Sequence, residues 1–580
     1  MIETLVDSFD IWGTAQTQKS LGKKAGIDNI SLHGINRLRE LILELAIRGK
    51  LTLQDFNDES ATILLDKIKK EKKKLISEGE IKKTKQLPEI TKEEIPFTLP
   101  KGWIFAHLND LGDWGAGATP LRNKTEYYNG KIPWFKSGEL SADYISESEE
   151  FVTELALKET SLRYNKPGDV LIAMYGATIG KTSILKVPGT TNQAVCACTP
   201  FTGFANTFLL TLLKAYKNRF IEMGAGGAQP NISREKIIAT IIALPPLPEQ
   251  LRIVAKVDEL MALCDKLEQQ QMNHIETHLK LVEALLQTLI NATNAEELKA
   301  AWQHLEPHFD ILFTTEESID LLKQTILQLA VMGKLVPQNP NDEPASELLK
   351  KIEAEKKKLI AEGKLKKKKP LPEITEEEKL FELPEGWEWS RLGFISEIKG
   401  GKRLPKGHSF SPYETPYIYI QVTNMKNGTI IDNDIKYITE QTKREISNYI
   451  ISKDDLYITI AGTIGGVGIV PKYFDGMNLT ENAAKICFYQ VDKEWLQKTL
   501  SAKYIQEQFT EKTNQLAQPK LALHRIASSC LAVPPLEEQF RIIAKVDELM
   551  SLCDQLKERI IATQELKVKL ADAVVAGAVI

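Results

Sequence analysis

The sequence predicts a mixed α/β fold with two α/β domains, separated by long paired antiparallel helices and related by a pseudo-twofold internal repeat. Three observations support this prediction. The chain has 580 residues, too many for a single hydrophobic core. Two blocks of sequence occur twice in the same order. These blocks have apolar residues at helical spacing, whereas the segments between them contain short runs rich in β-branched residues.

The internal repeat holds without gaps over long stretches. Residues 38–51, LRELILELAIRGKL, return as residues 322–335, LKQTILQLAVMGKL. Residues 245–268, beginning PPLPEQLRIVAKVDELM, return as residues 534–557, beginning PPLEEQFRIIAKVDELM. The segments between these blocks have diverged, which indicates duplication followed by change in two domains of ordinary size. The predicted parts are an N-terminal helical and linker region at 1–103, a first α/β domain at 104–245, a central helical spacer at 246–320, a second helical and linker region at 321–387, a second α/β domain at 388–533, and a C-terminal helix at 534–580 that pairs with the central helix.

The second repeated block predicts a long amphipathic helix in each copy. Its apolar residues follow one another at intervals of four, three, four and three positions, the spacing of a helix-pairing seam. Because both copies carry this seam, we expect the two helices to pack on each other; the alternative is that each helix packs on its own neighbouring domain. A polar interruption follows the first seam at residues 269–271. The seam residues are Ile253, Val257, Leu260, Cys264 and Leu267 in the first copy, and Ile542, Val546, Leu549, Cys553 and Leu556 in the second.

The diverged segments contain signals for both strands and helices. Residues 169–174 and 455–462 are short runs rich in branched apolar residues, close to glycines, as expected of buried strands. Residues 206–223 and 493–509 are long enough and periodic enough to form helices. Each diverged segment is therefore expected to be a mixed α/β domain.

Composition and charge exclude several classes of protein. Hydrophobic residues make up 43% of the chain and charged residues 26%, as in an ordinary globular protein. The net charge of −4 argues against a uniformly basic nucleic-acid coat but allows local basic patches. No apolar run approaches the roughly 20 residues that span a bilayer, and the N-terminus lacks the basic residues of a signal peptide. With six cysteines we expect a cytoplasmic protein without a disulfide scaffold.

The stretch YGATIGKTS at 175–183 nearly matches a phosphate-binding loop. That motif needs four residues between its first glycine and its Gly-Lys pair, but only three separate Gly176 and Gly180. The equivalent stretch of the second copy, IAGTIGGVG at 460–468, has no lysine. We therefore predict a structural turn after a strand in both copies rather than an ATP site.

No pattern of metal-binding or catalytic residues stands out. Cys196 and Cys198 would share one face of a strand, but no second pair lies near them in sequence. The histidine pairs at 274/278 and 304/308 lack the glutamate of a zinc-protease helix, so solvated helix faces are the better interpretation. Cys264 and Cys553 occupy matching seam positions and are expected in the core. We predict no metal and no catalytic residue, although an unrecognised active site stays an alternative.

The diverged segments do carry the residues that a nucleic-acid-binding surface would need. Lysine and arginine neutralise phosphates, whereas asparagine, glutamine, lysine and arginine form hydrogen bonds with base edges. The alternative for any one of these residues is an ordinary polar loop. The candidate DNA-binding residues are Arg122, Lys124, Lys136, Ser137, Lys181, Asn192, Gln193, Gln229 and Asn231 in the first segment, and Lys402, Arg403, Lys406, Gln421, Thr423, Asn424, Lys426, Asn482, Gln518 and Lys520 in the second.

The repeated blocks resemble those of one known family, the specificity subunits of type I restriction–modification enzymes. The resemblance rests on LPPLPEQLRIVAKVDELM at 244–261, VPPLEEQFRIIAKVDELM at 533–550 and ILQLAVMGKLVPQ at 326–338. The motifs LPKGW and LPEGW, which precede the two diverged segments, support it. It covers nearly the whole chain in the right order, apart from about the first 25 residues.

The resemblance implies that each diverged segment is a target recognition domain for one half of a split, asymmetric double-stranded DNA site. The helical spacer would fix the separation of the half-sites and dock two modification subunits. S-adenosylmethionine would be held by those methyltransferase subunits, and ATP and Mg by restriction subunits, so this chain would have no cofactor and no catalytic centre. Two other classes stay open: a complete enzyme, which would act without partners, and a coiled-coil scaffold, which would not need two divergent domains.

Overall fold

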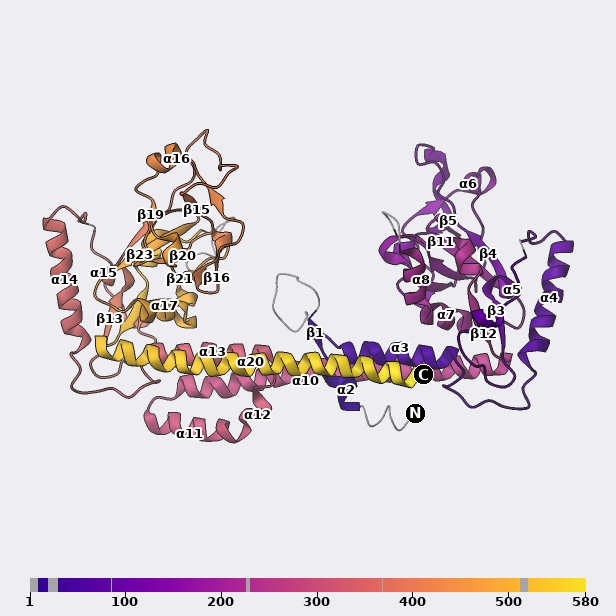
Figure 1. Cartoon of the computed structure of the whole chain (residues 1–580), viewed down its shortest axis with the longest axis horizontal. Coiled ribbons are helices and arrows are strands. Elements are labelled where there is room, and N and C mark those ends of the chain that lie inside the picture. Colours follow the sequence, from indigo (N-terminus) through magenta and orange to yellow (C-terminus); the bar gives the residue numbers. More distant parts are fainter. Residues whose placement is uncertain are drawn as a thin grey trace. The chain divides into compact units, whose positions relative to one another are not determined.

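The computed structural model describes residues 9–18, 30–84, 86–225, 230–367, 369–511 and 520–579. The chain forms two compact units, each with one mixed α/β domain and several helices (Figure 1). Unit 1 comprises Met1–His274 and Gln564–Ile580, and unit 2 comprises Ile275–Thr563. The predicted fold class, two α/β domains in an internal repeat with long helices, is confirmed.

The α/β domain of unit 1 is built on a five-stranded sheet in the order β4-β11-β8-β9-β6. Its central strand β8 is buried along its whole length, as the branched run at 169–174 predicts. Helix α7 packs against β8 and β9. The strands of the domain are β3 (Ile104–His107), β4 (Gly112–Ala116), β5 (Tyr128–Phe135), β6 (Tyr144–Ile145), β7 (Phe151–Val152), β8 (Val170–Ala173), β9 (Thr182–Leu185), β10 (Thr190–Thr191), β11 (Val195–Pro200) and β12 (Ile241–Leu244), and its helices are α5 (Leu108–Leu111), α6 (Glu154–Glu159), α7 (Asn206–Ala215), α8 (Lys217–Gly224) and α9 (Arg234–Ile238).

The α/β domain of unit 2 repeats this sheet in four strands, β14-β23-β20-β21, which match β4-β11-β8-β9 in order. A second sheet, β18-β15-β22-β19, packs its own apolar cluster around Ile418 and Ile420. The strands are β13 (Glu388–Arg391), β14 (Ser396–Gly400), β15 (Ile418–Ile420), β16 (Met425–Lys426), β17 (Thr429–Ile430), β18 (Lys436–Tyr437), β19 (Ile450–Ile451), β20 (Leu456–Thr459), β21 (Val467–Ile469), β22 (Met477–Leu479), β23 (Ala483–Phe488) and β24 (Cys530–Val533), and the helices are α15 (Leu392–Ile395), α16 (Glu440–Glu445), α17 (Lys493–Ser501), α18 (Lys503–Glu511) and α19 (Leu523–Ala527).

Both helices predicted within the domains are divided in the structure. The run at 206–223 becomes α7 and α8, separated by Tyr216, whose ψ of 3° leaves the helical region. The run at 493–509 becomes α17 and α18, separated by Ala502 in an extended conformation. Neither break is marked by proline or glycine, so the sequence signal for a helix end is missing.

The repeated blocks contribute to most of the other helices, including the two longest, whereas α2, α11 and α12 lie outside them. Helix α10 begins in unit 1 and ends in unit 2, whereas α20 begins in unit 2 and ends in unit 1. Within the described residues, no helix is long and apolar enough to span a membrane. These helices are α2 (Phe9–Thr14), α3 (His33–Ile47), α4 (Ala61–Ser77), α10 (Leu247–Asn291), α11 (Ala295–Leu305), α12 (Phe309–Leu312), α13 (Glu316–Val331), α14 (Ala345–Ala361) and α20 (Leu536–Val579), and a short strand pair joins β1 (Thr17–Gln18) to β2 (Ile30–Ser31).

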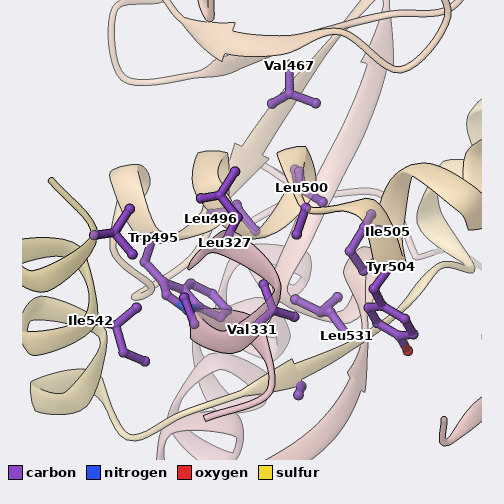
Figure 2. Close-up of a cluster of buried hydrophobic side chains, with 14 of the residues drawn as sticks. Leu327, Val331, Val467, Trp495, Leu496, Leu500, Tyr504, Ile505, Leu531 and Ile542 are labelled. Carbon is purple, nitrogen blue, oxygen red and sulfur yellow. The ribbon is translucent and has the colours of Figure 1, made fainter. Parts of the chain in front are cut away.

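The predicted seam residues are buried except for the four leucines, Leu260, Leu267, Leu549 and Leu556, which are half-buried, and in unit 2 some packing partners can be named. Ile542 and Val546 at the start of α20 lie against α13 and α17, around the indole of Trp495 (Figure 2). These turns therefore follow the alternative in which a seam packs on its own domain. Further along, Cys553 of α20 and Val282 near the end of α10 belong to the same hydrophobic cluster. In unit 1 the salt bridges of Arg39 join α3 to Asp265 and Glu268 of α10.

A buried carboxylate fixes the start of each long helix to its unit. In unit 1, Glu249 accepts hydrogen bonds from Trp103 Nε1 at 2.9 Å and from Gln54 Nε2 at 3.2 Å. One turn on, Arg252 forms a 2.6 Å salt bridge with Asp58. Burial raises the pKa of Glu249, while its hydrogen bonds from Trp103 and Gln54 oppose the shift.

Unit 2 repeats this arrangement with equivalent residues. Glu538 accepts from Trp387 Nε1 at 3.1 Å and from Gln338 Nε2 at 3.2 Å, and Arg541 pairs with Asp342 at 2.6 Å. Burial likewise raises the pKa of Glu538. We call these two sets the carboxylate junctions. They attach each α/β domain to its long helix in the same way.

Candidate nucleic-acid interface

Each α/β domain has a pair of loops held together by backbone hydrogen bonds, which we call the loop pair. In unit 1 it joins residues 117–124, after β4, to residues 191–195, between β10 and β11. The amide of Gly117 donates to the carbonyl of Val195 at 2.9 Å, and Ala118 donates to Thr191 at 3.0 Å. The amide of Asn192 donates in turn to Phe135 at the end of β5. The loop pair is therefore anchored in the core of the domain.

The loop pair of unit 2 has the same backbone pattern. Gly401 donates to Ala483 at 3.0 Å, Lys402 donates to Leu479 at 2.9 Å, and Thr480 donates to Ile420 at the end of β15. These bonds make residues 401–406 equivalent to the loop after β4, and residues 479–483 equivalent to 191–195. Two domains with different sequences thus share one backbone arrangement at this place.

The glycine that opens each loop pair is required by close approach of the backbone. A Cβ atom on Gly117 would lie 2.3 Å from the carbonyl oxygen of Asn192, and one on Gly401 would lie 2.1 Å from that of Thr480. Both distances are far below contact, so only glycine fits without displacing the neighbouring loop. Both glycines lie close in sequence to candidate DNA-binding residues, since Gly117 comes before Arg122 and Gly401 comes directly before Lys402.

The stretch that resembles a phosphate-binding loop forms a hairpin turn in both domains. Strand β9 follows it and pairs antiparallel with β8, whereas a phosphate-binding loop is followed by a helix. Gly180 and Gly465 adopt positive φ angles of 80° and 86° at equivalent places in the two turns. The predicted structural turn is confirmed. Lys181 lies at its end, and its side chain is half-buried.

The predicted cations of unit 1 are matched by acids. Arg122 pairs with Glu150 at 2.6 Å and lies over the rings of Tyr128 and Trp134, with its guanidinium carbon 4.8 and 4.9 Å from their centroids. Lys136 shares the same carboxylate at 3.3 Å. The hydrogen bond from Arg122 lowers the pKa of Glu150, and that from Lys136 adds to the shift. This part of the surface is therefore close to neutral.

Other predicted residues of unit 1 lie at or near the surface. The ammonium of Lys124 donates to the hydroxyl of Tyr127 at 2.9 Å. Asn192 uses its side-chain oxygen to accept from the Ala194 amide, whereas Gln193 is exposed. Ser137 is half-buried and Asn231 is exposed. Gln229 lies outside the described residues.

In unit 2 an acid that the sequence analysis did not single out organises the loop pair. Glu481 accepts from Arg403 Nε at 2.6 Å and from the Tyr419 hydroxyl at 3.2 Å. Its backbone carbonyl accepts from Lys520 Nζ at 3.1 Å. The predicted residues include no acid, although Glu481 lies in the TENAAK stretch (480–485) that contains Asn482.

One predicted DNA-binding residue has a structural role instead. Asn424 is buried; its side-chain oxygen accepts from the Gln421 amide at 2.9 Å, and its amide group donates to the Asn433 carbonyl at 2.7 Å. The prediction fails because both ends of the side chain are engaged within the domain. In unit 1 the equivalent contact joins the amide of Lys136 to Glu139.

The remaining candidates of unit 2 lie at or near the surface. No contact among the described residues joins all of their side chains. Their contact with DNA stays a prediction. Gln518 lies outside the described residues. Lys402, Lys406, Thr423, Lys426 and Lys520 are exposed, and Gln421 and Asn482 are half-buried.

None of the described residues form a group of three or more histidine, cysteine or acidic side chains able to hold a metal ion. Cys196 and Cys198 are both buried on β11, and burial raises the pKa of Cys196 to about 12. Thiols of this kind stay protonated and unreactive.

A duplicated domain that keeps one loop backbone and varies the side chains on it defines a class of protein able to recognise two different targets with one chain. Comparison with known proteins identifies the family. The model of the type I restriction modification DNA specificity domain matches residues 100–277 and 384–566, once in each copy. The chain belongs to this family.

Two relatives are similar over their full length. The chain is 37% identical to the type I restriction enzyme EcoAI specificity subunit of Escherichia coli, over 99% of both chains. It is 35% identical to the EcoEI specificity subunit of Escherichia coli, over 99% of this chain and 98% of the relative. The resemblance found in the repeated blocks is therefore confirmed.

Proposed function

We propose that this chain is the DNA specificity subunit of a type I restriction–modification complex and that each α/β domain recognises one half of a split, asymmetric double-stranded DNA site. The observation that carries this proposal is the loop pair, whose backbone is the same in both domains while its exposed side chains differ. A common backbone presents side chains at the same positions, and different side chains select different bases. Two such domains recognise two unlike half-sites.

The long helices support a second part of the proposal, the docking of two copies of a modification subunit. Leu251 of α10 and Phe540 of α20 are equivalent residues and are 53% and 48% exposed. Leu263 and Leu552 are also equivalent and are 54% and 55% exposed. Large apolar side chains left exposed at matching places form two copies of one apolar surface, as two identical partners would need. S-adenosylmethionine would be held by these partners, and ATP and Mg by restriction subunits.

The test is the methylation pattern made by the assembled complex. The chain is produced with its modification partner in a host that lacks other adenine methyltransferases, and methylated adenines are mapped across the genome. A discontinuous motif with two unlike halves is expected, and the chain alone should give no methylation. A continuous motif, or methylation by the chain alone, would contradict the proposal.

Exchange of parts tests the assignment of the halves. Replacing residues 104–245 by the corresponding domain of another family member should change one half of the motif and leave the other unchanged. Lengthening α10 by one helical turn at residues 269–271 should instead change the number of unspecified base pairs between the halves. If the domain exchange altered both halves, the assignment of one domain to one half would be wrong.

The docking surfaces can be tested by counting partners. Leu263→Asp and Leu552→Asp should each remove one modification subunit from the complex, and the double variant should remove both. Mass photometry measures the composition directly. Loss of both partners from a single variant would show that the two surfaces are not independent.

A further inference from the structure

The equivalence of the two loop pairs shows which exposed positions have changed while their backbone has not. The hydrogen bonds show that Ala118 is equivalent to Lys402, so the next residue in each loop, Thr119 and Arg403, is equivalent as well. By the same pattern Gln193 corresponds to Glu481. The second domain thus carries an ion pair where the first carries a threonine and a glutamine. A residue that contacts only phosphate has no reason to differ in this way, because every DNA sequence has the same backbone.

Arg403 is exposed, yet its side chain is held in place. The side chain is 79% exposed, and its Nε donates to Glu481 at 2.6 Å. Among the described residues no hydrogen bond engages its two terminal nitrogens. A guanidinium carries five N–H donors in a rigid fork, so the terminal edge is left pointing outward with its donors available.

Glu481, which holds Arg403, has further hydrogen-bond partners, two on its carboxylate and one on its backbone carbonyl. Glu481 Oε2 accepts from the hydroxyls of Tyr419 at 3.2 Å and Thr480 at 3.1 Å, and Lys520 donates to the Glu481 carbonyl. Tyr419 is buried, and its hydroxyl also donates to the Lys402 carbonyl at 2.7 Å. Burial and the hydrogen bond from Arg403 act in opposite directions on the pKa of Glu481, and the net effect is to lower it. The carboxylate is therefore ionised at neutral pH.

We propose that Arg403 is a specificity-determining residue of the second domain, which recognises a guanine through its two terminal nitrogens while Glu481 holds its side chain in position. This inference rests on the proposed function. Arginine forms paired hydrogen bonds with O6 and N7 of guanine in the major groove. A side chain already ordered by Glu481 loses less conformational entropy on binding than a free one. The adjacent negative charge of Glu481 disfavours a phosphate at the same place but does not oppose hydrogen bonding to a base edge.

The test compares three substitutions in the complex of this chain with its modification partner. Arg403→Ala should make one G·C position of one half-site degenerate in the methylation motif. In duplex binding, preference for guanine at that position should fall by about 5- to 150-fold. Arg403→Lys keeps the charge but loses the planar fork, so it should lose part of the preference, less than Arg403→Ala does, while keeping affinity for other sequences. Glu481→Gln leaves a weaker acceptor for Arg403 Nε and should reduce the preference by a smaller factor.

The control is a matched arginine in the same domain. Arg444 is 78% exposed and pairs with Glu440 at 2.6 Å, but it lies on α16 rather than in the loop pair. Arg444→Ala should leave the recognised sequence unchanged. If Arg403→Ala kept the wild-type motif, or weakened binding to all sequences equally with a shallower salt dependence, Arg403 would be a phosphate contact and the inference would be wrong. If the wild-type complex gave no divided motif, the proposed function itself would fail.

Discussion

The carboxylate junctions and the loop pairs differ in how far the two copies of the chain agree. At the junctions, Glu249 and Glu538 have the same partners at nearly the same distances. At the loop pairs the backbone hydrogen bonds agree, but the side chains differ. The second copy has the ion pair of Arg403 and Glu481 where the first copy has a threonine and a glutamine at the equivalent positions. The two copies have therefore kept the same residues where each domain is attached to its long helix, and have diverged at the exposed loop pairs.

A third region, the packing of α7 on α10 in unit 1 and of α17 on α20 in unit 2, agrees less between the copies than the junctions do. In unit 1 a groove of about 1180 Å³ runs between α3, α7 and α10. In unit 2 Trp495 is buried where α17 packs against α13 and α20, beside a cavity of about 10 Å³ (Figure 2). The residue equivalent to Trp495 is Phe208. The equivalence follows from matching hydrogen bonds, because Gln250 accepts from the amide of Ala205 and Gln539 accepts from the amide of Asp492. Side chains of the core have changed even though the attachment has not.

The largest predicted effect concerns this filled contact in unit 2. Trp495→Ala should lower the free energy of unfolding of unit 2 by about 3–5 kcal/mol, because it leaves a cavity among buried side chains. Trp302→Ala is the matched control, since Trp302 is 42% exposed on α11; it should change stability by less than about 0.5 kcal/mol. Urea unfolding measures both. Equal effects of the two substitutions would contradict the packing described for Trp495.

The next effect tests whether the two loop pairs need the same backbone. Gly117→Ala and Gly401→Ala should each destabilise their domain by about 1–3 kcal/mol, because the added methyl group overlaps a carbonyl oxygen. Each should also weaken methylation of the site, since the loop pair must move. Gly138→Ala is the control, as a Cβ there meets nothing within 4 Å. Thermal unfolding and methylation of a plasmid carrying the site measure the two effects; a normal Gly401→Ala variant would show that the equivalence of the loops is not required.

The carboxylate junctions predict a dependence of stability on pH. Burial raises the pKa of Glu249 and Glu538 above the ordinary value of 4.5, so the folded chain binds more protons than the unfolded chain just above that pH. The free energy of unfolding due to these groups therefore falls as pH rises through this window. The double variant Glu249→Gln, Glu538→Gln should lose that slope, because the amide groups do not titrate; it should also lose one of the two hydrogen bonds at each junction.

The measurement is urea unfolding at a series of pH values from about 4 to 8, over the range in which stability usually changes with carboxyl titration. Glu259→Gln, at an exposed position of α10, is the control and should retain the wild-type slope. A double variant that kept the wild-type dependence of stability on pH would show that these carboxylates do not cause it.

The smallest effect concerns an ion pair that only one copy has among the described residues. Lys498 on α17 pairs with Asp547 of α20 at 2.9 Å, whereas Thr211 and Asp258 occupy these positions in unit 1. Lys498→Thr should lower the stability of unit 2 by about 0.2–1 kcal/mol, because both side chains are partly exposed and screened by solvent. The loss should shrink at high salt, as measured by thermal unfolding. A loss that did not depend on salt would indicate packing rather than charge.

The sequence predicted the features that depend on periodicity and on repetition. It gave the long helices, the buried strands β8 and β20, and the turns at Gly180 and Gly465, because spacing and glycine are local signals. It could not predict the break at Tyr216, which no helix-ending residue marks. The position of this break depends on tertiary packing, which local sequence signals do not reveal.

The candidate site was less predictable from sequence. Asn424 has the same residue type as a base-contacting asparagine, but burial decides its role. Glu481 was overlooked because an acid is not expected to face DNA, and only its position beside Arg403 explains it. Glu249 follows a proline at the start of a helix, where an acid is ordinarily solvent-exposed, and its burial against Trp103 involves a residue 146 positions away.

The end of α20 has a consequence for how the chain folds as it is synthesised. Ala571 and Val575 complete the cluster of Trp12, Leu41 and Leu45, and Asp572 forms a 2.8 Å salt bridge with Arg37. Domains generally fold in order as they leave the ribosome. Here the α2–α3 part of unit 1, among the earliest segments to emerge, waits with an uncovered apolar face until the last turns of α20 have been made. A prematurely terminated chain would keep that face exposed, which marks it for aggregation or degradation before it can join a complex.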